Sequence, residues 1–217
     1  MRFDVTAGPT REPIDPVRFL SNRSSGKMGY AIAEAAVEAG HDVTLISGPV
    51  NLRAPENTRV IAVNTSDEMY EAVQNAVRDC DVLVMCAAIA DYKPAKYSEQ
   101  KVKKKSAALS LDLVPTRDIL SSIANHERSF FVVGFAAETE NVAANAEKKL
   151  REKNCDMIVA NDVSTSDYGM ESAENEVTIF FRNDETNTIS RAPKKNIARE
   201  LVKIITNMRE KSLTKKT

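Results

Sequence analysis

Apolar and polar positions along the chain follow two alternating patterns. Six segments are short and either β-branched or continuously apolar, as buried strands are: residues 3–7, 42–47, 59–63, 81–88, 130–135 and 156–161. Three segments repeat apolar positions at three- and four-residue spacing, as amphipathic helices do: residues 25–39, 67–79 and 142–153. This alternation is typical of βαβ units, so the sequence predicts an α/β fold with a mainly parallel sheet flanked by helices.

The pattern changes beyond residue 162. Residues 176–181 and 188–190 resemble two strands separated by a polar turn, and residues 194–210 resemble a final helix before a frayed tail at 211–217. A hairpin and one helix are too little for a separate core. We therefore expect residues 1–217 to form a single domain with a C-terminal β-hairpin and a final helix.

Two long loops interrupt the pattern, and each follows a predicted strand. Residues 8–24 separate the first strand from the first helix, where a connection of about 2–6 residues is usual. Residues 92–108 are polar and rich in lysine. Ligands of parallel α/β sheets bind at the carboxyl ends of the strands. We therefore expect the first segment to be an active-site loop and the second to be a flexible lysine flap.

The start of the first predicted helix has features of an anion site. With Ser24 as N-cap, the backbone amides of Ser25, Gly26 and Lys27 have no intrahelical partner, and the helix dipole is positive there. An ordinary capped helix also begins with free amides, so this feature alone does not distinguish an anion site from a simple helix start. The cationic and amide side chains of the preceding loop favour the anion site. Neither GxGxxG nor GxxxxGK[ST] occurs, so the usual dinucleotide and Walker motifs are absent.

The region after residues 81–88 carries three further candidates. Asp91 is either a ligand contact at a strand end or an ordinary turn residue. Tyr92 and Lys96 have the Tyr-x-x-x-Lys spacing of short-chain dehydrogenases, but Pro94 opposes the helix that this motif needs. Lys101 and the lysines that follow it form either a solvated face or a lid over phosphates.

Composition and charge narrow the classes of partner. A net charge of −1 provides no field for nucleic acid or a membrane surface, and no stretch approaches the roughly 18 apolar residues of a membrane span. Cys80, Cys86 and Cys155 are too few for a disulfide framework and, with two histidines, unsuited to structural zinc. We expect a cytoplasmic protein with no nucleic-acid or membrane partner and no metal ligands of its own.

Five motifs occur in register between about residues 5 and 165: TAGPTREPIDPVRFLSNRSSGKMG, AAIADYKP, KVKK, VGFAAET and KLREKNCDMIVANDVS. Together they resemble the phosphopantothenate–cysteine ligases of coenzyme A biosynthesis, most closely the bacterial CTP-dependent type. The resemblance implies a Rossmann-like homodimer that joins 4′-phosphopantothenate to L-cysteine through an acyl-cytidylate, releasing pyrophosphate and then CMP. It also implies Mg²⁺ with the CTP and, in many bacteria, coupling to a flavin-dependent phosphopantothenoylcysteine decarboxylase.

The same resemblance implies roles for single residues. Asn22 matches the family's catalytic asparagine, and Lys101 matches the first lysine of a flap that meets phosphate charge. The implied nucleotide-binding residues are Met85, Cys86, Ala87, Asp91, Lys101, Asp118, Ile119, Leu120, Ser121, Phe135, Lys149 and Lys153. The expected substrate and phosphate site consists of Arg18, Asn22, Ser24, Ser25, Gly26, Lys27 and Ala88.

Two alternatives to a ligase stay open at this point. One is a Rossmann-type NAD(P)-dependent oxidoreductase, which would require a helix through Pro94. The other is a non-catalytic nucleotide-binding module, which would bind CTP without releasing pyrophosphate. The preference for CTP over ATP rests on the resemblance, since no residue visibly reads a cytosine edge.

Overall fold

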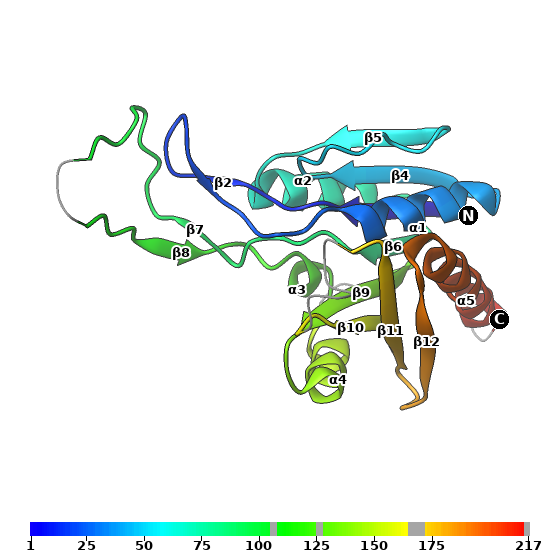
Figure 1. Cartoon of the computed structure of the whole chain (residues 1–217). Helices are drawn as coiled ribbons and strands as arrows, with labels where there is room; N and C mark the ends of the chain where they lie inside the picture. Colours follow the sequence, from blue (N-terminus) through cyan, green and yellow to red (C-terminus); the bar gives the residue numbers. More distant parts are fainter. Residues whose placement is uncertain (105–107, 125–127, 165–171, 215–217) are drawn as a thin grey trace.

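A sheet of eight strands runs through the centre of the computed structural model, which describes residues 1–104, 108–124, 128–164 and 172–214 (Figure 1). In chain order the strands are β1 (Arg2–Ala7), β4 (Asp42–Ser47), β5 (Thr58–Ala62), β6 (Val82–Met85), β9 (Phe131–Glu138), β10 (Met157–Asp162), β11 (Glu174–Phe181) and β12 (Thr186–Pro193). Their order across the sheet is β12-β11-β10-β9-β6-β1-β4-β5. All six predicted strands of the βαβ region are present, and β4 has the predicted bounds.

The topology of the parallel strands is that of a Rossmann fold. Strands β1, β4, β5, β6, β9 and β10 are mutually parallel, and numbered by chain position they lie in the order 3-2-1-4-5-6. The direction of winding reverses between β1 and β6, which pair from Phe3 with Val82 to Thr6 with Met85. The loops that leave the carboxyl ends of these two strands therefore flank the switch point where such folds bind ligands.

Helices cover both faces of the sheet and form two cores. Helices α1 (Lys27–Glu38) and α5 (Lys194–Thr214) lie side by side on one face, where Ile32 and Leu201 are fully buried (Figure 1). Helices α2 (Ser66–Ala76), α3 (Ile119–Ala124) and α4 (Val142–Glu152) cover the other face, where Met69 is fully buried. Each such large apolar side chain stabilises the fold by about 1.5–3 kcal/mol relative to exposure.

The C-terminal part confirms the predicted hairpin and final helix, with different bounds. Strand β12 pairs antiparallel with β11 over more residues than the predicted 188–190. Helix α5 continues to Thr214, past the predicted end at 210. Residues 215–217 of the predicted tail lie outside the described residues. Helix α2 instead ends at Ala76, earlier than the predicted residue 79.

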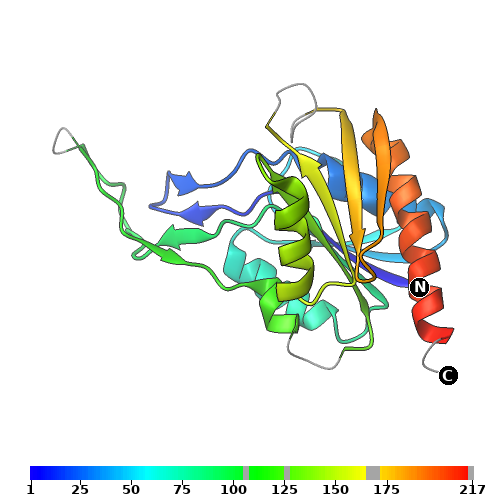
Figure 2. The ribbon, with the colours of Figure 1, turned by 90° about the horizontal axis from the view of Figure 1, so that it is seen from below.

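The two loops predicted to be irregular contain short strands. In residues 8–24, β2 (Glu12–Pro13) pairs with β3 (Phe19–Leu20). Further on, β7 (Tyr92–Pro94) pairs antiparallel with β8 (Leu113–Pro115), and the chain between them extends away from the body of the molecule (Figure 2). We call residues 92–104 and 108–115 the arm. The expectation of a structureless flap from residue 92 is thus wrong at its start. Tyr92 lies in a strand, so it does not share a helix face with Lys96.

Among the described helices, none combines the length and the apolar character that a membrane crossing requires. Cys80, Cys86 and Cys155 are free thiols. Burial raises the pKa of the Cys86 thiol to about 12, so this thiol stays protonated at neutral pH.

Candidate active site

Two cavities adjoin at the carboxyl edge of the sheet. The α1-side cavity, of about 430 Å³, is lined by the start of α1, the turn after β6 and the ends of β9 and β10. The α3-side cavity, of about 570 Å³, is lined by the same turn, the start of α3 and one face of α4. The residues that line both are Ala87, Ile89, Asp91, Phe135 and Lys149. One elongated ligand can therefore extend from one cavity into the other.

The start of α1 differs from the predicted capped helix. The helix begins at Lys27, and its N-cap is Gly26, whose φ of 74° is left-handed. Ser24 is therefore not the N-cap; its Oγ accepts a hydrogen bond from the Gly26 amide at 3.3 Å. The Gly26 amide, predicted to be free, thus has a partner in the structure. A residue in the left-handed region cannot continue a right-handed helix, so the helix starts two residues later than expected.

Three glycines form a close-packed cradle that the sequence motif search missed. A Cβ on Gly26 would lie 3.2 Å from the Cα of Gly8, and a Cβ on Gly29 would lie 2.6 Å from the Cβ of Ala7. In a dinucleotide-binding fold, G-x-G-x-x-G glycines make this strand-to-helix approach. Here Gly8 is separated from the pair Gly26 and Gly29 by residues 9–25. The fingerprint is present in space but divided by an insertion.

Asn22 lines the α1-side cavity and is held at both ends of its amide. Its Nδ2 donates to the Ala88 carbonyl at 2.5 Å, and its Oδ1 accepts from the Ser24 amide at 3.0 Å. An amide nitrogen has two hydrogens, so one N–H of Asn22 is left for a ligand. The side chain is thus a positioned donor beside the turn after β6.

Two buried threonines fix the turn after β6. Thr6 Oγ1 accepts from the amides of Cys86 and Ala87, each at 3.1 Å, and Thr10 Oγ1 accepts from the amide of Ala90 at 3.1 Å. Both threonines are fully buried. They replace the hydrogen bonds that the sheet no longer supplies where β6 ends, and so they hold the cavity wall in place. Sequence analysis did not single out either residue.

At the α3-side cavity, Asp118 caps the helix and binds a lysine. Its Oδ1 accepts from the Ser121 amide at 2.8 Å, and its Oδ2 accepts from Lys153 Nζ at 2.6 Å. Lys153 Nζ also donates to Ser121 Oγ at 2.9 Å. The pKa of the Asp118 carboxyl is lowered despite its partial burial, chiefly by the hydrogen bond from Lys153. Thr116 does not cap this helix. Its Oγ1 donates to the Ala90 carbonyl and so connects the segment before α3 to the turn after β6.

Lys149 lies between the two cavities. Its Nζ donates to the Phe135 carbonyl at 2.6 Å, which directs the ammonium group to the residues shared by both cavities. Burial lowers the pKa of Lys149 from its ordinary value. A cation that has lost part of its hydration here is well placed to interact with an anionic ligand.

Arg18 and Lys101 lie apart from the cavities. Arg18 pairs with the buried Asp15 at 2.5 Å, and its Nη2 also donates to the Val102 carbonyl at 2.6 Å. Asp15 Oδ2 accepts from the Val102 amide at 3.0 Å. The hairpin of β2 and β3 therefore holds the outer part of the arm, while the adjacent Lys101 is exposed. The last of the predicted flap lysines, Lys105, lies outside the described residues.

The remaining predicted residues converge as expected. Those that line one or both cavities are Asn22, Ser24, Ser25, Gly26, Lys27, Met85, Cys86, Ala87, Ala88, Asp91, Asp118, Ile119, Leu120, Phe135, Lys149 and Lys153. Ser121 contacts the cavity through Lys153. Residues from five separate segments of the chain thus share one place.

Comparison with protein families agrees with this geometry. The family described as the DNA/pantothenate metabolism flavoprotein C-terminal domain matches residues 1–208. The chain belongs to this family.

Members of this flavoprotein C-terminal-domain family include larger proteins. A coenzyme A biosynthesis bifunctional protein, CoaBC of Vibrio vulnificus (strain CMCP6), is 48% identical over 184 residues, covering 83% of this chain and 46% of that protein. A crystal structure of the C-terminal domain of a CoaBC bifunctional protein has a TM-score of 0.83 at 42% identity, covering 97% of this chain and 96% of that chain. The chain therefore spans about half the length of its curated relative.

A more distant structure shares the fold alone. A Cab2 variant solved in complex with phosphopantothenate-cysteine has a TM-score of 0.82 at 15% identity, and the match covers 100% of this chain and 89% of that chain.

The flavoprotein C-terminal domain also presents cavity residues that sequence analysis missed. In the α1-side cavity they are Met28, Gly29, Ile89, Ala137, Glu138, Asn161, Asn175 and Lys194. The sequence contains a signal for Asn161, because this polar residue ends the apolar run of 156–161 at the carboxyl edge of the sheet, where ligands bind. Lys194 had none, because it stands at the start of a C-terminal helix far from the motifs.

The described part of this family member contains no group of three or more His, Cys, Asp or Glu residues arranged to hold a metal ion. Glu138 and Asp91 line the α1-side cavity singly. Mg²⁺ keeps several waters and binds readily to substrate phosphates. The residues present suit a metal that arrives on a polyphosphate better than one held by the protein.

Proposed function

We propose that this chain is a phosphopantothenate–cysteine ligase of coenzyme A biosynthesis. One observation carries the proposal: the donor amide of Asn22, the glycine cradle at Gly26 and the carboxylate of Asp91 line two cavities that share a wall. A glycine cradle at a helix start suits phosphate, and a fixed amide donor suits a developing oxyanion. The CoaBC names of relatives at 48% and 42% identity support the same assignment.

The first step is activation of a carboxylate. The nucleotide base and ribose occupy the α3-side cavity near Asp118 and Asp91, and the triphosphate extends over Lys149 toward Gly26. The carboxylate oxygen of 4′-phosphopantothenate attacks the α-phosphorus of CTP, the bond to the β-phosphate breaks, and pyrophosphate leaves. Lys149 offsets the negative charge that this step concentrates. Mg²⁺ carried by the triphosphate would supply further neutralisation of phosphate charge.

The second step is amide formation. The amine of L-cysteine attacks the acyl carbon of the acyl-cytidylate, the bond to CMP breaks, and the amine loses a proton. Negative charge develops on the acyl oxygen during the attack. The N–H of Asn22 that does not bind Ala88 donates to this oxygen. Lys101, exposed on the arm, supplies positive charge to the phosphates.

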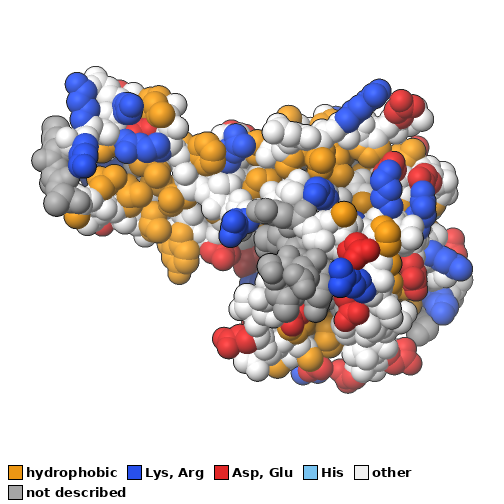
Figure 3. All heavy atoms as spheres, in the orientation of Figure 1, with side chains coloured by type: hydrophobic (Ala, Val, Ile, Leu, Met, Phe, Trp, Pro, Cys, Tyr) orange, Lys and Arg blue, Asp and Glu red, His pale blue; other side chains and the backbone are white. Residues whose placement is uncertain are grey.

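The arm carries the observation that favours a homodimer. Its exposed large apolar side chains, with those of the neighbouring β2–β3 hairpin, are Val17, Phe19, Tyr92, Tyr97, Leu109, Leu111, Leu113 and Val114 (Figure 3). Contiguous exposed apolar surface of this kind marks an interaction site. We propose that a second copy of the chain covers it. Leu113→Glu should then convert the dimer to a monomer in analytical ultracentrifugation, whereas Leu213→Glu, on α5, should not.

The relatives also support a functional partner. Because this chain matches the C-terminal half of bifunctional proteins, we propose that its product passes to a flavin-dependent phosphopantothenoylcysteine decarboxylase, in the cytoplasm. Pull-down of this chain with a separately expressed decarboxylase, with and without product, tests that coupling.

Mass spectrometry of a reconstituted reaction tests the ligase proposal. The chain is incubated with 4′-phosphopantothenate and either CTP or ATP, with and without L-cysteine. We expect an acyl-cytidylate and pyrophosphate without cysteine, and phosphopantothenoylcysteine and CMP with it. Binding of CTP without pyrophosphate would support a non-catalytic module, and hydride transfer to NAD(P)⁺ an oxidoreductase. Equal use of ATP would overturn the nucleotide preference alone.

A further inference from the structure

Lys194 is a buried cation that the proposed mechanism does not use. It is the first residue of α5, and only 6% of it is exposed. Its Nζ donates to the Ser172 carbonyl at 2.7 Å, and the residue lines the α1-side cavity. A buried lysine is costly unless its charge serves a purpose. Because it lines the cavity wall, an anion bound in this cavity would lie beside it.

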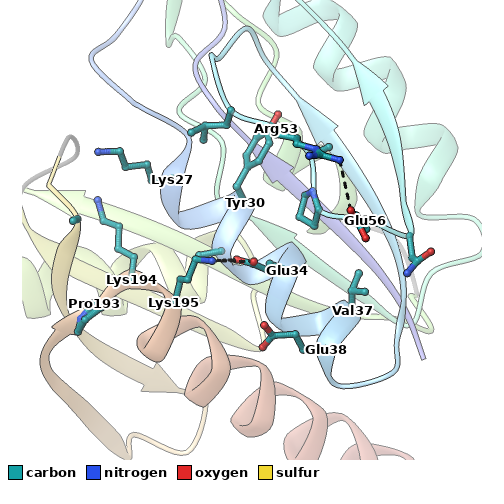
Figure 4. A pocket seen from close by; sticks show the side chains of 16 residues that line it. Lys27, Tyr30, Glu34, Val37, Glu38, Arg53, Glu56, Pro193, Lys194 and Lys195 are labelled. Atoms are coloured by element: carbon teal, nitrogen blue, oxygen red, sulfur yellow. Dashed lines mark hydrogen bonds and ion pairs between the residues drawn. The ribbon is translucent and has the colours of Figure 1, made fainter.

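Lys27 lines the same cavity from a different helix. It is the first residue of α1, so the starts of α1 and α5 both reach this cavity with a lysine. Neither first turn contains an acidic residue, whereas the first turn of α2 contains Asp67 and Glu68. Figure 4 shows the side chains of Lys27 and Lys194 extending toward the same side. Two lysines and two positive helix ends thus act on one volume.

Lys27 is close enough to Lys194 to affect its ionisation. Burial, followed by the charge of Lys27, lowers its pKa. A partly enclosed cavity with low-dielectric walls concentrates such a field and attracts anions. The neighbouring Lys195 differs, since its Nζ pairs with Glu34 at 2.9 Å on the outside of the helices (Figure 4).

The α1-side cavity has two distinguishable ends. At one end Asp91, Phe135 and Lys149 join it to the α3-side cavity. At the other end Lys27 and Lys194 join it to a groove of about 840 Å³ between α1, residues 52–57 and the start of α5 (Figure 4). A chain of phosphates that enters from the Asp91 end would place its terminal groups beside these two lysines.

We infer that Lys194, together with Lys27, binds the terminal phosphates of the nucleotide and so holds the pyrophosphate that leaves in the activation step. This inference rests on the proposed ligase function for its place in the reaction. The binding itself needs only a linear polyphosphate. Lys194 is accordingly a substrate-contacting residue contributed by the C-terminal helix.

Inorganic tripolyphosphate is the probe that separates binding from catalysis. Its dissociation constant is measured by isothermal titration calorimetry for the wild type, Lys194→Gln, Lys194→Arg and Lys195→Gln, with far-UV circular dichroism and thermal unfolding as folding checks. We expect Lys194→Gln to weaken binding roughly 10- to 100-fold, as loss of a charged hydrogen bond does. Lys194→Arg should keep most of the affinity, and Lys195→Gln should match the wild type.

Steady-state kinetics places the contact in the reaction. Lys194→Gln should raise the KM for the nucleotide by a similar factor while leaving the KM for L-cysteine unchanged. Equal tripolyphosphate affinity in wild type and a folded Lys194→Gln variant overturns the inference. If Lys194→Gln does not fold, Lys194→Arg and Lys194→Met are measured instead, and unaltered affinity in Lys194→Met has the same meaning. A wild type that binds tripolyphosphate but makes no product overturns the ligase proposal and leaves the anion site standing.

Discussion

Asn22 holds the carbonyl of Ala88 through its Nδ2, at 2.5 Å, and this bond ties the active-site loop to the turn after β6. The Ala88 carbonyl also accepts from the Thr10 amide at 3.1 Å. Two segments that are more than sixty residues apart in the chain thereby form one wall. The donor that we assign to catalysis is thus held in position before any ligand binds, which limits the reorganisation needed during reaction.

Asn22→Asp should impair the cysteine step. A carboxylate cannot donate to the acyl oxygen or to Ala88, and its negative charge opposes the one that develops. We expect product formation to slow by about 10²–10³-fold while acyl-cytidylate accumulates, as loss of comparable donors does. Rapid-quench mass spectrometry measures both species. Asn183→Asp, in the exposed turn between β11 and β12, is the matched control, and normal product formation by Asn22→Asp would exclude the assigned role.

Gly29→Ala should loosen the glycine cradle. The new Cβ would lie 2.6 Å from the Cβ of Ala7 and 3.0 Å from the Thr6 carbonyl, so α1 must move away from β1. We expect the free energy of unfolding to fall by about 1–3 kcal/mol and the KM for the nucleotide to rise. Chemical denaturation measures the first effect. Glu34→Gln, on the outer face of the same helix, should change stability by less than about 0.5 kcal/mol.

Asp15→Asn should release the outer part of the arm. The Arg18 guanidinium beside Asp15 holds the pKa of that carboxyl well below its usual range, so the attachment persists at every pH above about 4 and is lost only in strong acid. The neutral side chain cannot form the paired contact with Arg18. We expect faster amide hydrogen exchange in residues 98–104 and slower turnover, with the core unchanged. Asp184→Asn, which affects a surface pair with Arg151, is the control, and unaltered exchange in Asp15→Asn would contradict this account.

Lys149→Arg should change the pH dependence of nucleotide binding. Because burial lowers the pKa of Lys149, the wild type should lose affinity at a pH below about 10.4, where an ordinary lysine titrates. Arginine stays charged, so the variant should keep its affinity through this range. The KM for the nucleotide between pH 7 and 10 is the measurement. If the KM for the nucleotide changes with pH in the same way in both proteins, another group controls the loss of affinity at alkaline pH.

The same shift has a consequence for stability. Between the lowered pKa of the folded protein and the ordinary value, the unfolded chain binds a proton at Lys149 that the folded chain does not. The contribution of Lys149 to the free energy of unfolding therefore rises with pH through this window, while nucleotide binding falls.

Much of the fold follows from local pattern. The continuous apolar run before Met85 predicts a central parallel strand, because both faces of such a strand are covered. Helix ends were less predictable. Ser24 is a favourable N-cap by residue type, but Gly26 adopts a left-handed conformation that delays the helix to Lys27. Short strands such as Tyr92–Pro94 leave no periodic signal, because three residues cannot show one.

For the candidate site too, residues in local sequence motifs were predicted and residues placed by long-range packing were not. Asn22 and Asp91 were predicted through motifs that are contiguous in sequence, and the structure brings them to adjoining cavity walls. Lys194 and Thr6 were missed because their positions depend on packing between distant segments. Lys194 reaches the cavity through the contact of α5 with α1, and Thr6 acts through the strand beside it. No spacing rule along the chain contains these relationships.

The segment between Gly8 and Gly26 is closed at its base. Its two ends meet at the cradle, because Gly26 packs against Gly8. Asn22 lies near one of these ends and is bonded to the turn after β6. A side chain carried on a long excursion of the chain is therefore held as firmly as one placed on the sheet itself.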